Sequence, residues 1–298
     1  MSEQKILDLL KSNQLTKAKQ FIENLLNSEK ENITYIFYYG LILANERKYR
    51  DAINFFEKAL AADKSHYDSN FNIAGCYQGL LIFDKAIEYY ENCSKINTNK
   101  FEPYHQIGIC YKQLRKYEDS ISNLKKALKI SVNAKSFYIL GNVYRENGQF
   151  EEAKRSFEKS IDINKEFTQS KLSLANLEID YENYERAGRM LDEIIKSNES
   201  ETVLISAKIM IGNILKSKGD FEKAIKINQD ILEKDTNNVD ALYNISQCYL
   251  FTKEYEKGWT YHESRYNLQS LVLLKQIYES FNKPCLLYTS DAADELSR

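Results

Sequence analysis

A small residue recurs along almost the whole chain at intervals of 33, 34 or 37 residues. A bulky apolar residue lies three positions before most of these small residues. A unit of this length cannot bury its own apolar face, so units that repeat at this period must stack on their neighbours. The period therefore restricts the chain to a tandem-repeat architecture. The small residues are Ala18, Ala52, Ala86, Ser120, Ala153, Ala187, Ala224 and Gly258.

Each interval contains a second small residue, flanked by large apolar residues three or four positions away. This spacing is typical of helices, and no segment sustains the alternation that marks strands. Only two prolines interrupt the chain. We therefore predict two helices in each repeat, with the small residues allowing the helices to approach closely. The second set comprises Gly40, Ala74, Gly108, Gly141, Ala175, Gly212 and Ser246.

The repeat that begins near Phe137 has the pattern FxxLGxxY, followed by Gly148, Phe150, Ala153 and Phe157. This pattern resembles the tetratricopeptide repeat. The resemblance implies an all-α fold, a right-handed α-solenoid of tandem antiparallel helix pairs with a concave groove. We expect about eight such repeats over residues 1–266, followed by a C-terminal helix. The repeats are expected to start near residues 1, 33, 67, 101, 134, 168, 205 and 239.

One interval is three residues longer than the others, between Ala187 and Ala224. The segment Ser197–Glu201 is polar, so we expect the extra residues to form a loop insertion there. Such a loop would also be a suitable boundary between two sub-arrays.

The composition is that of a folded protein, with 43% hydrophobic and 28% charged residues. The formal net charge of −2 gives no bias toward nucleic acid. No apolar run approaches the roughly 18 residues that a membrane span needs. The N-terminus is polar rather than signal-like, so we expect a cytoplasmic protein without nucleic-acid or membrane partners.

Residue spacing offers no sign of catalysis, a metal or a cofactor. The histidines His66, His105 and His262 have no partner at metal-ligand spacing, and the five cysteines form no CxxC pair. Cys76, Cys110 and Cys248 share one repeat position, where we expect each to pack against a neighbouring helix. We predict no catalytic residue, no metal site and no cofactor.

The residue after the second small position is expected to face the groove. In the last four repeats this residue is an amide, which can both donate to and accept from the backbone of an extended peptide. Three positions further along, cationic residues would add positive charge. The alternative is that asparagine is abundant in this chain and is tolerated on an exposed face. The candidate ligand-binding residues are Asn142, Asn176, Asn213 and Gln247, with Lys112, Arg145 and Lys216.

The last residues of the chain have a different character. Residues 285–294 (CLLYTSDAAD) resemble one reading frame of a transposon-end sequencing adapter. We therefore expect residues 285–298 to be a non-native tail and residues 267–284 to be a helix and linker to a domain that is missing here. Under this interpretation Cys285 is not a native cysteine.

The run GWTYHESR at residues 258–265 is similar to an element that ends the repeat arm of many bacterial tetratricopeptide glycosyltransferases. It departs from that element at His262, where tyrosine is usual. Two functions therefore stand. The first is a scaffold that binds a protein or peptide in its groove. The second is the substrate-binding arm of a truncated glycosyltransferase, whose uncut gene product would be an enzyme. The bound partner and the oligomeric state are not readable from the sequence.

Overall fold

The computed structural model describes residues 2–197 and 199–264. Within these residues the chain forms sixteen α-helices and no strand, which confirms the predicted all-α class. The chain divides into two compact units, residues 1–170 and 171–298. The division lies inside a helix, rather than at the Ser197–Glu201 segment. The helix and linker expected at 267–284 and the tail expected at 285–298 lie outside the described residues.

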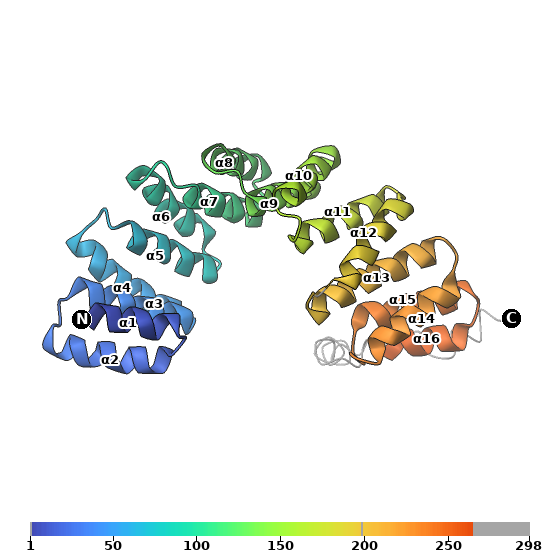
Figure 1. The fold of residues 1–298 in the computed structure, drawn as a ribbon, viewed down its shortest axis with the longest axis horizontal. Coiled ribbons are helices and arrows are strands. Elements are labelled where there is room, and N and C mark those ends of the chain that lie inside the picture. Colours follow the sequence, from blue (N-terminus) through green and yellow to red (C-terminus); the bar gives the residue numbers. More distant parts are fainter. Residues whose placement is uncertain (1, 198, 265–298) are drawn as a thin grey trace, which may run out of the picture. The chain divides into compact units, whose positions relative to one another are not determined.

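Unit 1 consists of five helix pairs in which each helix packs on the next one along the chain (Figure 1). We call the first helix of each pair the A helix and the second the B helix. The A helices have odd numbers and the B helices even numbers. The pairs are α1 (Ser2–Lys11) with α2 (Leu15–Ser28), α3 (Ile33–Asn45) with α4 (Tyr49–Ala62), α5 (Tyr67–Gly79) with α6 (Phe83–Ile96), α7 (Glu102–Gln113) with α8 (Tyr117–Ile130), and α9 (Ala134–Glu146) with α10 (Phe150–Ile163).

Unit 2 contains three further pairs of the same kind. Its boundary at Ser170 falls near the start of α11, so most of that helix belongs to unit 2. The pairs are α11 (Thr168–Asp180) with α12 (Tyr184–Lys196), α13 (Glu201–Ser217) with α14 (Phe221–Leu232), and α15 (Val239–Phe251) with α16 (Tyr255–Ser264).

The turn inside every pair contains one residue in the left-handed backbone region, with φ between 55° and 78°. In the α9–α10 turn this residue is Gly148, and the backbone N–H of Gln149 donates to the carbonyl of Tyr144 at 2.8 Å. This bond satisfies a carbonyl at the end of α9 and reverses the chain, so the two helices run antiparallel. The left-handed residues are Asn13, Arg47, Leu81, Arg115, Gly148, Glu182, Gly219 and Lys253.

The two sets of small residues lie where helices touch, as predicted. A Cβ atom added to Gly141 would lie 2.5 Å from Cε1 of Phe157, and one added to Gly108 would lie 2.6 Å from Cγ of Leu124. The first seven residues of the other set, from Ala18 to Ala224, are fully buried. A larger side chain at either position would separate two helices that pack in contact.

The extra residues of the long interval lengthen a helix instead of forming the expected loop insertion. Helix α13 begins at Glu201 and has 17 residues, whereas α11 and α15 have 13 each. The segment from Thr202 to Leu204 is therefore helical, because Val203 packs against a buried apolar cluster that includes Leu191 and Ile194 of α12. Of the residues expected to form the loop, Glu201 already belongs to α13.

Candidate functional site

Three of the predicted amides lie at the same place on the A helices of unit 2. Asn176 on α11, Asn213 on α13 and Gln247 on α15 each follow a buried small residue and are half-buried. None of the three side chains makes a hydrogen bond within the part of the chain that the structure describes. Helices α13 and α15 are in contact, so two of these amides lie on neighbouring A helices. Their donors and acceptors are therefore available to another molecule.

The fourth predicted amide, Asn142, belongs to unit 1 and lies on α9. Only 7% of Asn142 is exposed, and its side chain also makes no hydrogen bond to the described residues. It is not among the described side chains that have a polar atom both shielded from solvent and without a hydrogen bond. Water or a ligand can therefore reach this amide, and an unpaired polar group so nearly buried is uncommon. The structure groups three of the four amides in one unit and places Asn142 in the other.

The predicted basic residues differ from one another in their partners. The Nζ atom of Lys112 lies 2.9 Å from a carboxylate oxygen of Glu146 on α9, so its charge is compensated. Lys216 donates a hydrogen bond of 3.0 Å to Oδ1 of Asn244 on α15. Burial lowers the pKa of Lys216 from its ordinary value. Arg145 is half-buried and has no ion pair among the described residues. Of the three, only Lys112 has its charge compensated by a carboxylate.

Lys216 begins a chain of polar contacts that the sequence did not indicate. Its acceptor Asn244 is 4% exposed and donates to Oδ1 of Asn228 at 3.5 Å. Asn228 in turn donates to the carbonyl of Ala224 at 2.7 Å. The chain thus connects the fully buried core position on α14 with the A-helix face. Polar groups at these positions are satisfied by one another, as burial requires.

A buried carboxylate in unit 2 has a structural explanation. Glu178 on α11 is fully buried, and its Oε1 atom lies 2.8 Å from a guanidinium nitrogen of Arg186. Asn183 donates to the other oxygen at 2.8 Å. Pairing of this kind offsets the cost of burying a charge, so Glu178 is assigned to packing rather than to ligand binding.

The histidines and cysteines lie in structural settings. His66 caps α5 by accepting from the backbone N–H of Ser69, and His105 forms a 2.8 Å hydrogen bond with Ser136. Burial raises the pKa of Cys76 to about 11 and that of Cys110 to about 12, so both thiols stay protonated at neutral pH. Within residues 2–197 and 199–264, no group of three His, Cys, Asp or Glu side chains is suited to hold a metal ion.

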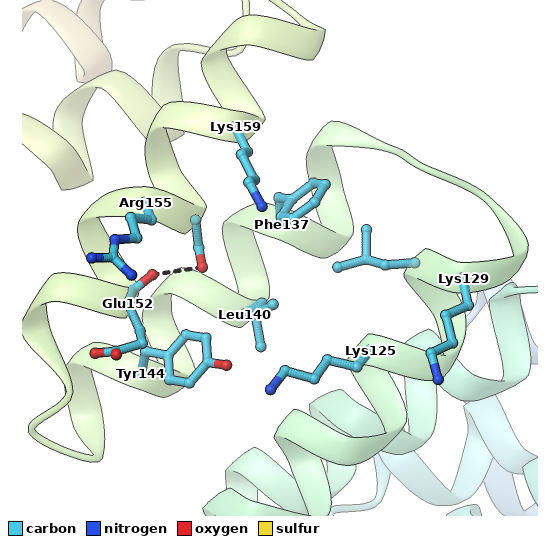
Figure 2. Close-up of a pocket in the computed structure, with 10 residues that line it drawn as sticks. Lys125, Lys129, Phe137, Leu140, Tyr144, Glu152, Arg155 and Lys159 are labelled. Carbon is cyan, nitrogen blue, oxygen red and sulfur yellow. Dashed lines mark hydrogen bonds between the residues drawn. The ribbon is translucent and has the colours of Figure 1, made fainter.

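A cleft of about 380 Å³ in unit 1 was missed by the sequence analysis (Figure 2). We call it the α8–α10 cleft. Its walls come from the B helices α8 and α10, and its floor comes from α9. The lining residues are Lys125, Leu128, Lys129, Phe137, Leu140, Tyr144, Glu152, Arg155, Ser156 and Lys159.

Family models match three stretches of the chain. The model described as anaphase-promoting complex, cyclosome, subunit 3 matches residues 45–127. Two tetratricopeptide repeat models match residues 134–167 and residues 205–232. In the described residues, no helix has the length and apolar character that crossing a membrane requires.

Among curated proteins, the chain is similar to protein O-mannosyl-transferase Tmtc3 from Drosophila melanogaster. The two are 25% identical over 127 residues, which is 42% of this chain and 13% of that protein. The chain therefore spans only a small part of the length of this relative.

Solved structures share the fold at low identity. A tetratricopeptide repeat protein from Parabacteroides merdae has a TM-score of 0.63 at 17% identity, over 83% of this chain and 97% of that one. Pseudomonas aeruginosa pilF has a TM-score of 0.59 at 18% identity, over 72% and 96%. MamA from Desulfovibrio magneticus RS-1 has a TM-score of 0.52 at 17% identity, over 56% and 94%. Residues 134–167 and 205–232 thus match tetratricopeptide repeats, and the stacked helix pairs have the fold of solved tetratricopeptide repeat structures.

Proposed function

We propose that this protein is a scaffold that binds a segment of another protein on the face formed by the A helices of unit 2. The observation that carries the proposal is the set of three amides on these helices, at one repeat position, with no hydrogen bond to the described residues. Tetratricopeptide folds are typically interaction modules rather than catalysts. We accordingly assign no catalytic residue, metal or cofactor to this face.

The chemistry of amides suits an extended peptide. Each amide side chain donates through its nitrogen and accepts through its oxygen, so it can pair with both groups of a peptide backbone. Contacts to backbone atoms are made with any sequence, so the amides would supply affinity with little selectivity. Lys216 lies in the same unit and is hydrogen-bonded to a neutral amide, so its ammonium group can attract a carboxylate of the ligand.

The test is a selection from a displayed library of random peptides on the full chain, followed by fluorescence anisotropy with a selected peptide. We expect Asn176→Ala combined with Asn213→Ala to weaken binding on the order of tenfold, because each lost hydrogen bond costs about 0.5–1.5 kcal/mol. The matched control is Gln20→Ala combined with Gln229→Ala, which removes two exposed amides from B helices. Equal affinity for the two double variants would contradict the proposal.

A second candidate function is favoured by a different observation. The chain is similar to protein O-mannosyl-transferase Tmtc3, and its GWTYHESR motif at residues 258–265 resembles an element of repeat-containing glycosyltransferases. Both likenesses associate these repeats with sugar-transferring proteins. In this case the A-helix face would hold the acceptor substrate for a catalytic domain elsewhere in the protein. Sequencing the gene past the codon for Pro284 tests this. A downstream nucleotide-sugar-binding domain supports the candidate, and a stop codon within a few repeats removes it.

A further inference from the structure

The α8–α10 cleft combines an apolar floor with an open rim. Leu140 and Tyr144 on α9 are buried, and Phe137 is half-buried (Figure 2). Leu128 adds an aliphatic side chain from α8. A volume of about 380 Å³ lies at the lower end of the range for small ligand sites and is large enough for a bulky side chain. The floor therefore offers a place for an apolar group.

Both walls of the cleft are cationic. Lys125 and Lys129 are one turn apart on α8, and Arg155 and Lys159 are one turn apart on α10. All four are exposed, and none forms an ion pair with the residues that the structure describes. Glu152 is the single carboxylate lining the cleft. Like charges gathered in this way repel one another, so an anion bound between the walls would relieve that repulsion.

Aromatic rings hold two of the cations above the floor. The Nζ atom of Lys125 lies 5.8 Å from the centre of the Tyr144 ring, and that of Lys159 lies 5.5 Å from the centre of the Phe137 ring. Each ammonium group is attracted to the face of its ring. The same side chains therefore form the apolar surface and position the positive charges around it.

The equivalent positions one repeat earlier do not carry this charge. The cleft has five charged lining residues, four cations and one carboxylate. At the five equivalent positions one repeat earlier there are two lysines, two carboxylates and a serine, so the charges balance. The concentration of cations is thus particular to the α8–α10 cleft and is not a general property of the B helices. The earlier positions are Glu91 and Lys95 on α6 and Asp119, Ser122 and Lys126 on α8.

We propose that the α8–α10 cleft binds an acidic peptide segment of a partner protein. An apolar side chain of the peptide would pack on Phe137 and Leu140, and the carboxylates on either side of it would pair with the cations of the two walls. The apolar floor favours a peptide over a nucleic acid or an anionic membrane. The formal net charge of −2 also gives the whole chain no attraction for such polyanions. This site is separate from the proposed A-helix face.

The experiment uses the full chain and a short labelled peptide in which glutamates flank a phenylalanine, with binding followed by fluorescence anisotropy. We expect Lys129→Glu combined with Arg155→Glu to weaken binding on the order of tenfold or more, since two attractive charge pairs become repulsive. The matched control is Lys95→Glu combined with Lys126→Glu, which reverses two exposed lysines at the earlier position. This control should leave binding within about twofold of the unmodified chain.

Changes in the peptide and the buffer complete the test. Replacing the glutamates by glutamines, replacing the phenylalanine by alanine, or raising the salt concentration should each weaken binding. The proposal is overturned if the peptide does not bind, if both double variants weaken it equally, or if the glutamine peptide binds as well. Stronger binding to single-stranded DNA or to phosphatidylserine vesicles, lost in Lys129→Glu with Arg155→Glu, would also overturn it in favour of those anions.

Discussion

In the α9–α10 pair, the ring of Phe157 fills the space opposite Gly141, whereas in the α13–α14 pair Asn228 fills the same space opposite Gly212. Both side chains are fully buried. Phe157 is held by apolar packing, and Asn228 is held by hydrogen bonds that continue to Asn244. The repeat therefore fixes the distance between the two helices more strictly than it fixes whether the side chain between them is apolar or polar.

The largest effect is expected from removing the side chain at this position. Phe157→Ala should lower the free energy of unfolding by about 3–5 kcal/mol, because it loses burial and leaves a cavity. Asn228→Ala should cost less, about 1–3 kcal/mol, chiefly by leaving the buried amide of Asn244 short of a partner. Urea unfolding, with hydrogen exchange of the α9–α10 and α13–α14 segments, measures both. Equal losses of unfolding free energy would contradict the expectation that Phe157 contributes more to stability than Asn228.

A smaller effect is expected from filling the opposite side. Gly141→Ala should cost about 1–3 kcal/mol, because its Cβ would lie 2.5 Å from a buried ring that has no room to move. In Gly212→Ala the Cβ would lie 2.6 Å from Nδ2 of Asn228, the end of a smaller side chain that can shift by weakening its hydrogen bond to Ala224. The better helix propensity of alanine offsets part of that cost, so a smaller loss of about 1 kcal/mol is expected. Thermal unfolding of the two variants tests this order, which a larger loss in Gly212→Ala would reverse.

The smallest effect concerns pH. Because burial lowers the folded-state pKa of Lys216 below its ordinary value of 10.5, the unfolded chain binds the proton more tightly. The resulting penalty is present below the folded pKa and disappears as the pH rises toward the unfolded one. The stability of the unmodified chain relative to Lys216→Met should therefore increase between pH 7 and pH 10. Denaturant midpoints of both proteins across this range measure it, and a constant difference would contradict the burial of Lys216.

Repeat spacing predicted the helix pairs well, because the small residues and the residues that face them recur at fixed distances in sequence. The buried positions of Ala18, Ala153 and Cys110 followed from that spacing alone. The long interval was interpreted less well. A polar run suggested a loop at Ser197–Glu201, but the apolar residues after it had enough packing partners to extend α13.

The candidate site was only partly readable. The amides could be aligned by their repeat position, and their lack of hydrogen bonds became visible only in the structure. The α8–α10 cleft had a signal that was overlooked: two cations lie one turn apart on each of two neighbouring B helices, Lys125 and Lys129 on α8 and Arg155 and Lys159 on α10. The sequence did not reveal that these cations lack ion pairs, because a repeat position does not show which carboxylates of the neighbouring repeat lie close enough to pair with them.

By itself, the sequence determined the all-α class, the number of helix pairs and the residues at each helix contact. These features depend on a pattern that is repeated locally, so each copy reinforces the same interpretation. The tertiary structure decided that Lys112 is neutralised by Glu146, that Lys216 is bound to Asn244, and that four cations surround one cleft. Such pairings depend on distances of a few ångströms between side chains on different helices, and only the packed structure sets those distances.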